Sequence, residues 1–165
     1  MSDLRIRNFD PSMASDFDRI NRQWIEEMYA IEPLDEAQLT DPFGRIVEPG
    51  GDILFVESED LGVFGTCGLL KTGECEFELI KMGIVPEARG RGAGEALLKA
   101  TIARAFALGA ARLFLLTNSK SQSAIRMYER NGFVHDAEIL ASSGAEYARC
   151  DVAMLYAGER PTSAS

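Results

Sequence analysis

A glycine-rich turn between a strand and a helix constrains this chain more than any other feature. The segment IVPEARGRGAGEALL, Ile84 to Leu98, passes from an apolar strand pattern through the turn directly into a helical pattern. Such a turn exposes the first N–H groups of the helix beside the positive end of its dipole, and glycine lets a phosphate approach the backbone. The segment therefore predicts a site for a phosphate-bearing ligand.

The spacing of the glycines disfavours the two common nucleotide-binding loops. A Walker A loop needs Lys-Ser/Thr after its last glycine, whereas Glu95 follows Gly94. The dinucleotide fingerprint G-x-G-x-x-G, counted from Gly90, also ends on Glu95. A purely structural turn remains an alternative, although the basic flanks Arg89 and Arg91 favour an anion site.

The rest of the sequence predicts a single α/β domain over residues 1–158 and a disordered tail over residues 159–165. Strands are expected where apolar residues alternate or run together, and helices where they recur every three or four positions. The expected elements are a strand at 4–9, a helix at 12–29, a meander of strands at 52–58, 62–70 and 75–85, a helix ending at Gly109, a strand at 112–117, a helix at 121–130 and closing strands at 133–140 and 150–157.

Cysteine and histidine content argues against a metal centre or a disulfide framework. The three cysteines, Cys67, Cys75 and Cys150, are odd in number and share no short spacing. The single histidine, His135, cannot build a multi-histidine site. We therefore expect no metal, and we interpret His135 as an ordinary polar residue on a closing strand.

Charge and hydropathy exclude several classes of partner. The net charge of −9 and the pI near 4.7 argue against nucleic-acid binding. No apolar run approaches the length of about 18 residues that a membrane helix needs, and the N-terminus MSDLRIRNFD is charged where a signal peptide is apolar. These features predict a cytoplasmic protein with no nucleic-acid or membrane partner.

Two sequence blocks together resemble the GNAT superfamily of acyl-CoA-dependent N-acyltransferases. The phosphate loop of that family reads Gln/Arg-x-x-Gly-x-Gly/Ala, and every fixed position is matched by Arg89-Gly90-Arg91-Gly92-Ala93-Gly94. The segment AIRMYERNGF, Ala124 to Phe133, resembles the family's A-x-x-(L/F)-Y-x-x-x-G-F block. The order and separation of the blocks also fit, and the resemblance covers nearly the whole chain. It implies a mixed, mostly antiparallel twisted sheet of about seven strands with about four flanking helices, splayed between strands 4 and 5.

The resemblance implies acetyl-CoA as cosubstrate. Backbone amides of Gly90 to Gly94 would cradle its pyrophosphate, with Arg89 and Arg91 adding positive charge. Pantetheine would enter the splayed wedge and pair with the backbone near Met82 and Ile84 like an extra strand.

One position departs from the family pattern. Many members carry an asparagine three residues before Ala124, where this chain has Ser121, while Asn118 lies three residues earlier. The contact to pantetheine could therefore come from Asn118, Lys120 or Ser121. Ser121 is equally well interpreted as a helix N-cap.

The implied reaction is attack of an amine on a thioester, which needs a neutral amine, a stabilised oxyanion and a proton for the departing thiolate. The N–H of Met82 could polarise the carbonyl if the strand bulges there, and Tyr128 matches the family tyrosine near the sulphur. Glu78 lies where several members place a catalytic base, and Glu76 projects from the same side. A plain polar role for these carboxylates, a water relay or a self-deprotonating substrate are alternatives.

The sequence says least about the amine that would accept the acyl group. In the family, regions corresponding to about 24–43 and 142–147 shape its pocket. The first region contains an acidic group that could attract a cationic amine or form a solvated face. Its members are Glu26, Glu27, Glu32, Asp35 and Glu36.

These observations predict an N-acetyltransferase that acts on a primary amine by direct attack in a ternary complex, without a cysteine nucleophile. The alternatives are a non-catalytic CoA-binding regulatory or interaction module and a nucleotide-binding domain of another kind. A homodimer through the C-terminal strands is also expected from the resemblance.

Overall fold

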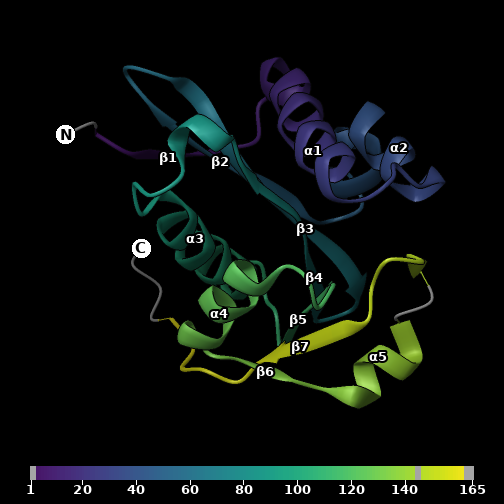
Figure 1. Ribbon diagram of the computed structural model, residues 1–165. Coiled ribbons are helices and arrows are strands. Elements are labelled where there is room, and N and C mark those ends of the chain that lie inside the picture. Colours follow the sequence, from purple (N-terminus) through teal and green to yellow (C-terminus); the bar gives the residue numbers. More distant parts are fainter. Residues whose placement is uncertain (1–2, 144–145, 162–165) are drawn as a thin grey trace.

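A seven-stranded sheet forms the centre of the computed structural model, which describes residues 3–143 and 146–161 (Figure 1). The strand order is β1-β2-β3-β4-β5-β7-β6, and every neighbouring pair is antiparallel except β4 and β5. The strands are β1 Arg5–Asn8, β2 Asp52–Ser58, β3 Gly62–Gly73, β4 Glu76–Ile84, β5 Arg112–Thr117, β6 Phe133–His135 and β7 Val152–Tyr156. The mostly antiparallel sheet expected from the sequence is confirmed.

Helices cover both faces of this sheet, with α1 and α2 on one face and α3 and α4 on the other (Figure 1). The α-helices are α1 Ala14–Met28, α2 Pro33–Thr40, α3 Ala93–Ala107, α4 Gln122–Arg130 and α5 Ala137–Ser143. Short 3-10 turns lie at Pro11–Met13 and Pro86–Ala88, and a π-helical turn at Phe43–Val47. Within the described part of the chain, no helix is long and apolar enough to cross a membrane.

Alternation along the strands sorts the apolar side chains between the two faces. The core under α3 and α4 takes Phe77 and Leu79 from β4, whereas the core under α1 takes Ile80. A smaller cluster of Phe114, Ile139 and Ala153 places α5 on the β5 and β7 end of the sheet. The central strands are therefore buried on both faces.

Two helices depart from the prediction. Residues 133–140 were expected to form one closing strand, but β6 ends at His135 and α5 begins at Ala137. The side chain of Asp136 accepts the N–H of Ile139 at 3.0 Å, which satisfies the start of this helix. Helix α2 was not predicted, although Glu32 and Asp35 form a capping box and Pro33 occupies the first helical position. Of the expected disordered tail, residues 162–165 lie outside the described part of the chain.

A wedge opens in the sheet between β4 and β5. Their parallel pairing runs only from Glu76 opposite Arg112 to Leu79 opposite Leu115. Strand β4 nevertheless continues to Ile84. The second half of β4 therefore has no partner on the β5 side, and the expected splay is confirmed.

Candidate active site

The glycine-rich loop has the backbone geometry of an anion site. Gly90 and Gly92 have φ of 87° and 78°, in the left-handed region that favours glycine. Gly92 is the N-cap of α3, and a Cβ at either glycine would meet nothing within 4 Å. The first amides of α3 thus adjoin open space at the positive end of the helix dipole. Arg89 is exposed beside them, and Arg91 forms an ion pair with Asp60 at 3.0 Å.

Strand β4 bulges where it passes the wedge. Its pairing with β3 places Gly83 opposite Thr66 and Ile80 opposite Gly68, so that Cys67 alone faces two residues of β4, Lys81 and Met82. Lys81 has a φ of 53°, a left-handed conformation that costs a non-glycine residue about 1–2 kcal/mol. The bulge on which the predicted role of Met82 depends is therefore present.

A pocket occupies the wedge and is lined from both faces of the sheet. Among the predicted site residues, it brings together Glu78, Met82, Asn118, Ser121 and Tyr128. Ile84 and the Arg89–Gly94 loop do not line it. Its other lining residues are Trp24, Tyr29, Leu79, Ile80, Lys81, Leu115, Leu116, Thr117, Tyr147, Arg149 and Cys150.

Tyr128 reaches the pocket from α4. Its side chain is buried, and its ring packs edge-on against Phe133 with 5.8 Å between the centroids. Burial raises the pKa of Tyr128 well above its usual range, and the proximity of Cys67 adds to this effect. Among the described residues, no hydrogen bond engages its hydroxyl. The side chain is thus a neutral phenol that can donate a proton into the pocket.

Glu78 faces the pocket from the α1 side of the sheet, because it alternates with Phe77 and Leu79 of the opposite core. The residue is only 2% exposed. Burial, and then the charge of Glu146, raise the pKa of Glu78 to about 8. A carboxyl group with this pKa exchanges its proton near neutral pH, as a general base requires.

Two other predicted candidates lie outside the pocket. Glu76 forms an ion pair with Arg112 at 3.1 Å and accepts a hydrogen bond from Thr72 at 2.9 Å. His135 is exposed and contacts Glu129 at 3.1 Å. Neither side chain reaches the residues that could carry chemistry.

The candidates for the pantetheine contact already have partners. Asn118 donates to the carbonyl of Arg149 at 2.5 Å and accepts the N–H of Lys120 at 2.9 Å. Ser121 occupies the N-cap position of α4, but its side chain makes no capping hydrogen bond. Its hydroxyl instead lies 2.8 Å from that of Tyr29. Ser121 is therefore the N-cap residue, as predicted, but its side chain does not make the hydrogen bond of a cap.

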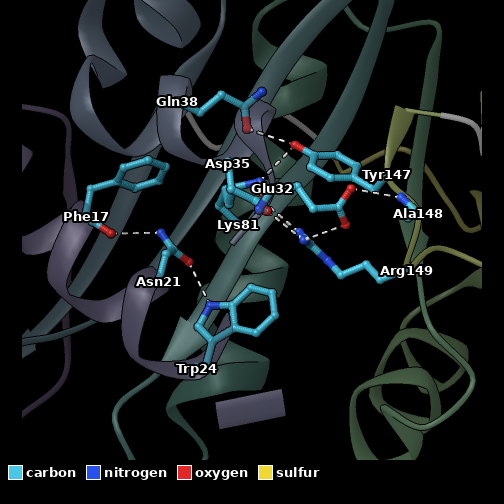
Figure 2. A network of polar contacts seen from close by, with 10 residues as sticks. All are labelled: Phe17, Asn21, Trp24, Glu32, Asp35, Gln38, Lys81, Tyr147, Ala148 and Arg149. Carbon is cyan, nitrogen blue, oxygen red and sulfur yellow. Dashed lines mark hydrogen bonds and ion pairs between the residues drawn. The ribbon is translucent and has the colours of Figure 1, made fainter. Parts of the chain in front are cut away.

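Trp24 lies against β4 on the α1 side of the pocket. Its Nε1 donates to the Oδ1 of Asn21 at 2.8 Å, and Asn21 donates to the carbonyl of Phe17 at 2.9 Å. A Cβ at Gly83 would lie 2.4 Å from Cδ1 of the indole. A side chain at Gly83 would therefore exclude Trp24 from this position. Figure 2 shows the hydrogen bonds that join Trp24, Asn21 and Phe17.

A buried polar network centred on Asp35 borders the pocket (Figure 2). The fully buried carboxylate of Asp35 contacts Lys81 Nζ at 2.8 Å and both Nη atoms of Arg149 at 2.7 and 2.8 Å. It also accepts the N–H of Glu32 at 2.9 Å. Tyr147 receives a hydrogen bond from Lys81 at 2.9 Å. The three parts of the chain in this network are far apart in sequence.

This network was not predicted from the sequence, and neither interpretation of the acidic group holds for Asp35. Asp35 is neither a free attractor for a cationic amine nor part of a solvated face, because it is buried and paired. Glu32 pairs with Arg149 at 3.4 Å, and Glu36 with Arg22 at 2.8 Å. A usable signal was the lysine within the apolar run FELIKMGIV, since a buried ammonium needs a buried carboxylate.

Replacing Asp35 with alanine is expected to lower the free energy of unfolding by about 3–5 kcal/mol, because the buried Lys81 loses its carboxylate partner and the part-buried Arg149 retains only Glu32. Burial opposes the charge of Asp35, but the hydrogen bonds from Arg149 and the charge of Lys81 prevail and lower its pKa to about 2. The stabilisation is therefore complete above the ordinary pKa of 3.8 and is lost as the pH falls toward 2. Urea unfolding at several pH values measures this.

The control is Glu36→Ala, which removes an exposed ion pair from the same helix and should change the free energy of unfolding by no more than about 1 kcal/mol. Equal effects of the two substitutions would contradict a stabilising role for the buried network.

Known proteins resemble this chain in sequence. Residues 15–133 match the sequence profile of the Acetyltransferase (GNAT) family. An uncharacterized N-acetyltransferase of Mycobacterium bovis is 35% identical over 95 residues, which are 58% of this chain and 56% of that protein. The chain thus spans little more than half the length of the curated relatives that it matches.

Solved structures share the fold. A GNAT-family acetyltransferase of Staphylococcus aureus superposes with a TM-score of 0.82 and 20% identity, covering 93% of this chain and 98% of that one. An acetyltransferase of Salmonella typhimurium, solved with its cofactor acetyl-CoA, superposes with a TM-score of 0.70 and 16% identity, covering 96% of each chain.

Proposed function

Because this chain belongs to the acetyltransferase (GNAT) family, we propose that it transfers an acetyl group from acetyl-CoA to a primary amine by direct attack in a ternary complex. The observation that carries this proposal is the pocket in the wedge between β4 and β5, into which Tyr128 and Glu78 project from opposite faces of the sheet. An acyl donor can therefore enter from one side and an amine from the other.

The glycine-rich loop is suited to the pyrophosphate of acetyl-CoA. The left-handed glycines Gly90 and Gly92, the open space in front of them and the start of α3 together form a backbone donor site. Beyond Leu79, the backbone of β4 has no partner on the β5 side, which leaves it available to pantetheine. The similarity in fold to a structure that contains acetyl-CoA supports acetyl-CoA as the cosubstrate.

Three groups of this chain would act on the reacting atoms. Glu78, as carboxylate, accepts a proton from the amine, whose nitrogen then attacks the thioester carbonyl carbon. The N–H of Met82 stabilises the resulting oxyanion. When the carbon–sulphur bond breaks, Tyr128 donates a proton to the departing thiolate and takes up the second proton of the nitrogen, which becomes the amide. No step needs a covalent bond to the protein.

The loop assignment predicts that Gly92→Glu weakens binding of acetyl-CoA and CoA by about 100-fold, because a carboxylate would stand where the phosphates must lie. Isothermal titration with acetyl-CoA, CoA, ATP and NAD measures the affinity and selectivity of the wild type and the variant. The matched control is Gly109→Glu at the opposite end of α3, since Gly109 also has a positive φ, 99°, and open space around it. CoA affinity in this control should stay at the wild-type value.

Absence of CoA binding by the wild type, or preferential binding of ATP or NAD, would refute the proposed cofactor. Tight CoA binding without thiol release on any amine would instead identify a non-catalytic CoA-binding module.

A further inference from the structure

We propose that Lys81 is a positioning residue, whose buried ion pair with Asp35 keeps β4 in its bulge and thereby keeps the Met82 amide in place for catalysis. This inference rests on the proposed function. Lys81 itself need not touch either substrate. Its effect would pass through the backbone to the next residue.

The backbone at Lys81 is the first observation. Among the described residues, it is the only one other than glycine with a positive φ. A bulge of this type usually carries glycine at the left-handed position. A non-glycine residue remains in such a conformation only when its surroundings enforce it, and such positions cluster at functional sites.

The contacts of the Lys81 side chain hold the backbone in this conformation. The side chain is 2% exposed, and its Nζ contacts Asp35 at 2.8 Å and donates to the Tyr147 hydroxyl at 2.9 Å (Figure 2). Asp35 is fixed in turn by the two Nη atoms of Arg149 and by the capping box of α2. Helix α2 and the segment before β7 thus converge on one ammonium group.

The bulge and the ion pair depend on each other. Leu79 packs in the α3 core and Ile80 in the α1 core, so regular alternation would turn Lys81 into the α3 core. The extra residue lets Ile80 and Lys81 both face the α1 and α2 side, after which Met82 packs against the α3 core. Without the ion pair, nothing on the side chain would offset the free-energy cost of a positive φ at a non-glycine residue in position 81.

Two substitutions separate positioning from other roles. Lys81→Leu removes the ion pair but keeps a side chain that disfavours a positive φ, whereas Lys81→Gly removes the ion pair and allows that φ. We expect Lys81→Leu to lower kcat by about 10- to 100-fold, approaching the loss of one oxyanion donor, with little change in the KM for acetyl-CoA. Lys81→Gly should recover most of kcat, although both variants lose stability.

The matched control is Arg104→Leu, which removes the ion pair with Asp52 at 2.7 Å in another part of the fold. Its kcat should equal that of the wild type. Circular dichroism and CoA titration establish that each variant is folded. If Lys81→Leu does not fold, Lys81→Gln takes its place, because it is also neutral and disfavours a positive φ.

A second readout is independent of turnover. In protein labelled with ¹⁵N-methionine, the Met82 amide resonance can be assigned by its loss in Met82→Leu. It should move in Lys81→Leu and return toward the wild-type position in Lys81→Gly, while the resonance of Met13, in the 3-10 turn before α1, stays unchanged. The shift of the Met82 resonance can be measured even if the wild type acetylates no amine. Lack of activity would then overturn the proposed function but not the positioning role of Lys81.

Three results would overturn the positioning role. One is an unchanged kcat and Met82 resonance in Lys81→Leu. Another is equal loss of kcat in the leucine and glycine variants with the Met82 resonance in place, because Lys81 would then act through its own ammonium group. The third is an increase in the KM for acetyl-CoA that accounts for the whole defect.

Discussion

Tyr128→Phe is expected to lower kcat by about 100- to 10,000-fold, the range for losing a general acid. The phenylalanine ring retains the packing against Phe133 and removes only the hydroxyl that projects into the pocket. Because burial raises the pKa of Tyr128, the wild-type hydroxyl stays protonated over the whole working pH range, so its proton is available when the thiolate departs. A thiol-release assay with saturating acetyl-CoA measures this effect.

The control for this substitution is Tyr156→Phe, which removes a hydroxyl outside the pocket that donates to the carbonyl of Glu159. It should retain wild-type kcat. CoA affinity should be nearly unchanged in Tyr128→Phe. A kcat within about threefold of wild type, far below the usual effect of a general acid, would show that Tyr128 only orients the cofactor.

Glu78→Gln is expected to lower kcat by about 100- to 10,000-fold and to change its pH dependence. A base must be ionised, and burial raises the pKa of Glu78 to about 8, so wild-type kcat should rise with pH until about pH 8 and then level off. The glutamine variant should lack this rise. The control is Glu76→Gln, which alters a neighbouring carboxylate outside the pocket. It should keep the rise with pH, with a slightly lower midpoint, because the charge of Glu76 contributes to the raised pKa of Glu78.

The same substitution has a predictable effect on stability. Between the ordinary pKa of 4.5 and about 8, the folded protein retains a proton on Glu78 that the unfolded chain releases. Wild-type stability therefore falls as the pH rises through this window. Glu78→Gln removes this cost, so its free energy of unfolding should exceed that of wild type by the largest margin above pH 8. Urea unfolding at pH 5 and pH 9 measures the difference. A greater loss of stability for the variant at pH 9 than at pH 5 would contradict the buried carboxyl.

Local patterns made the phosphate loop and the main elements predictable. A positive φ at Gly90 and Gly92 and the start of α3 depend on residues within a few positions of one another. The apolar residues of a strand recur every two positions and those of a helix every three to four, so each pattern shows which face of a single element is buried. Helix α5 was missed because the apolar residues after His135 fit a strand, whereas Asp136 starts a helix there.

The candidate site was predictable only where a side chain lies in or near a recognisable block. Tyr128 was predicted from such a block and Glu78 from its position on the strand before the glycine-rich loop, and the structure brings both to one pocket. The alternation of β4 also suggested Glu76, but the salt bridge to Arg112 lies at the start of the strand, away from the wedge. Position along the strand, and not the face alone, separates the two carboxylates.

By itself, the sequence determined the family, the glycine-rich turn before α3 and most of the strands and helices, because each depends on residues close together in the chain. Only the tertiary structure decided the bulge at Lys81 and the environment of Asp35. Both depend on contacts of Lys81 with residues more than 40 positions away along the chain, and an extra residue in β4 reverses the alternation on which strand interpretation rests. The free energy of a buried charge depends on which distant groups surround it, and that is fixed only when the chain has folded.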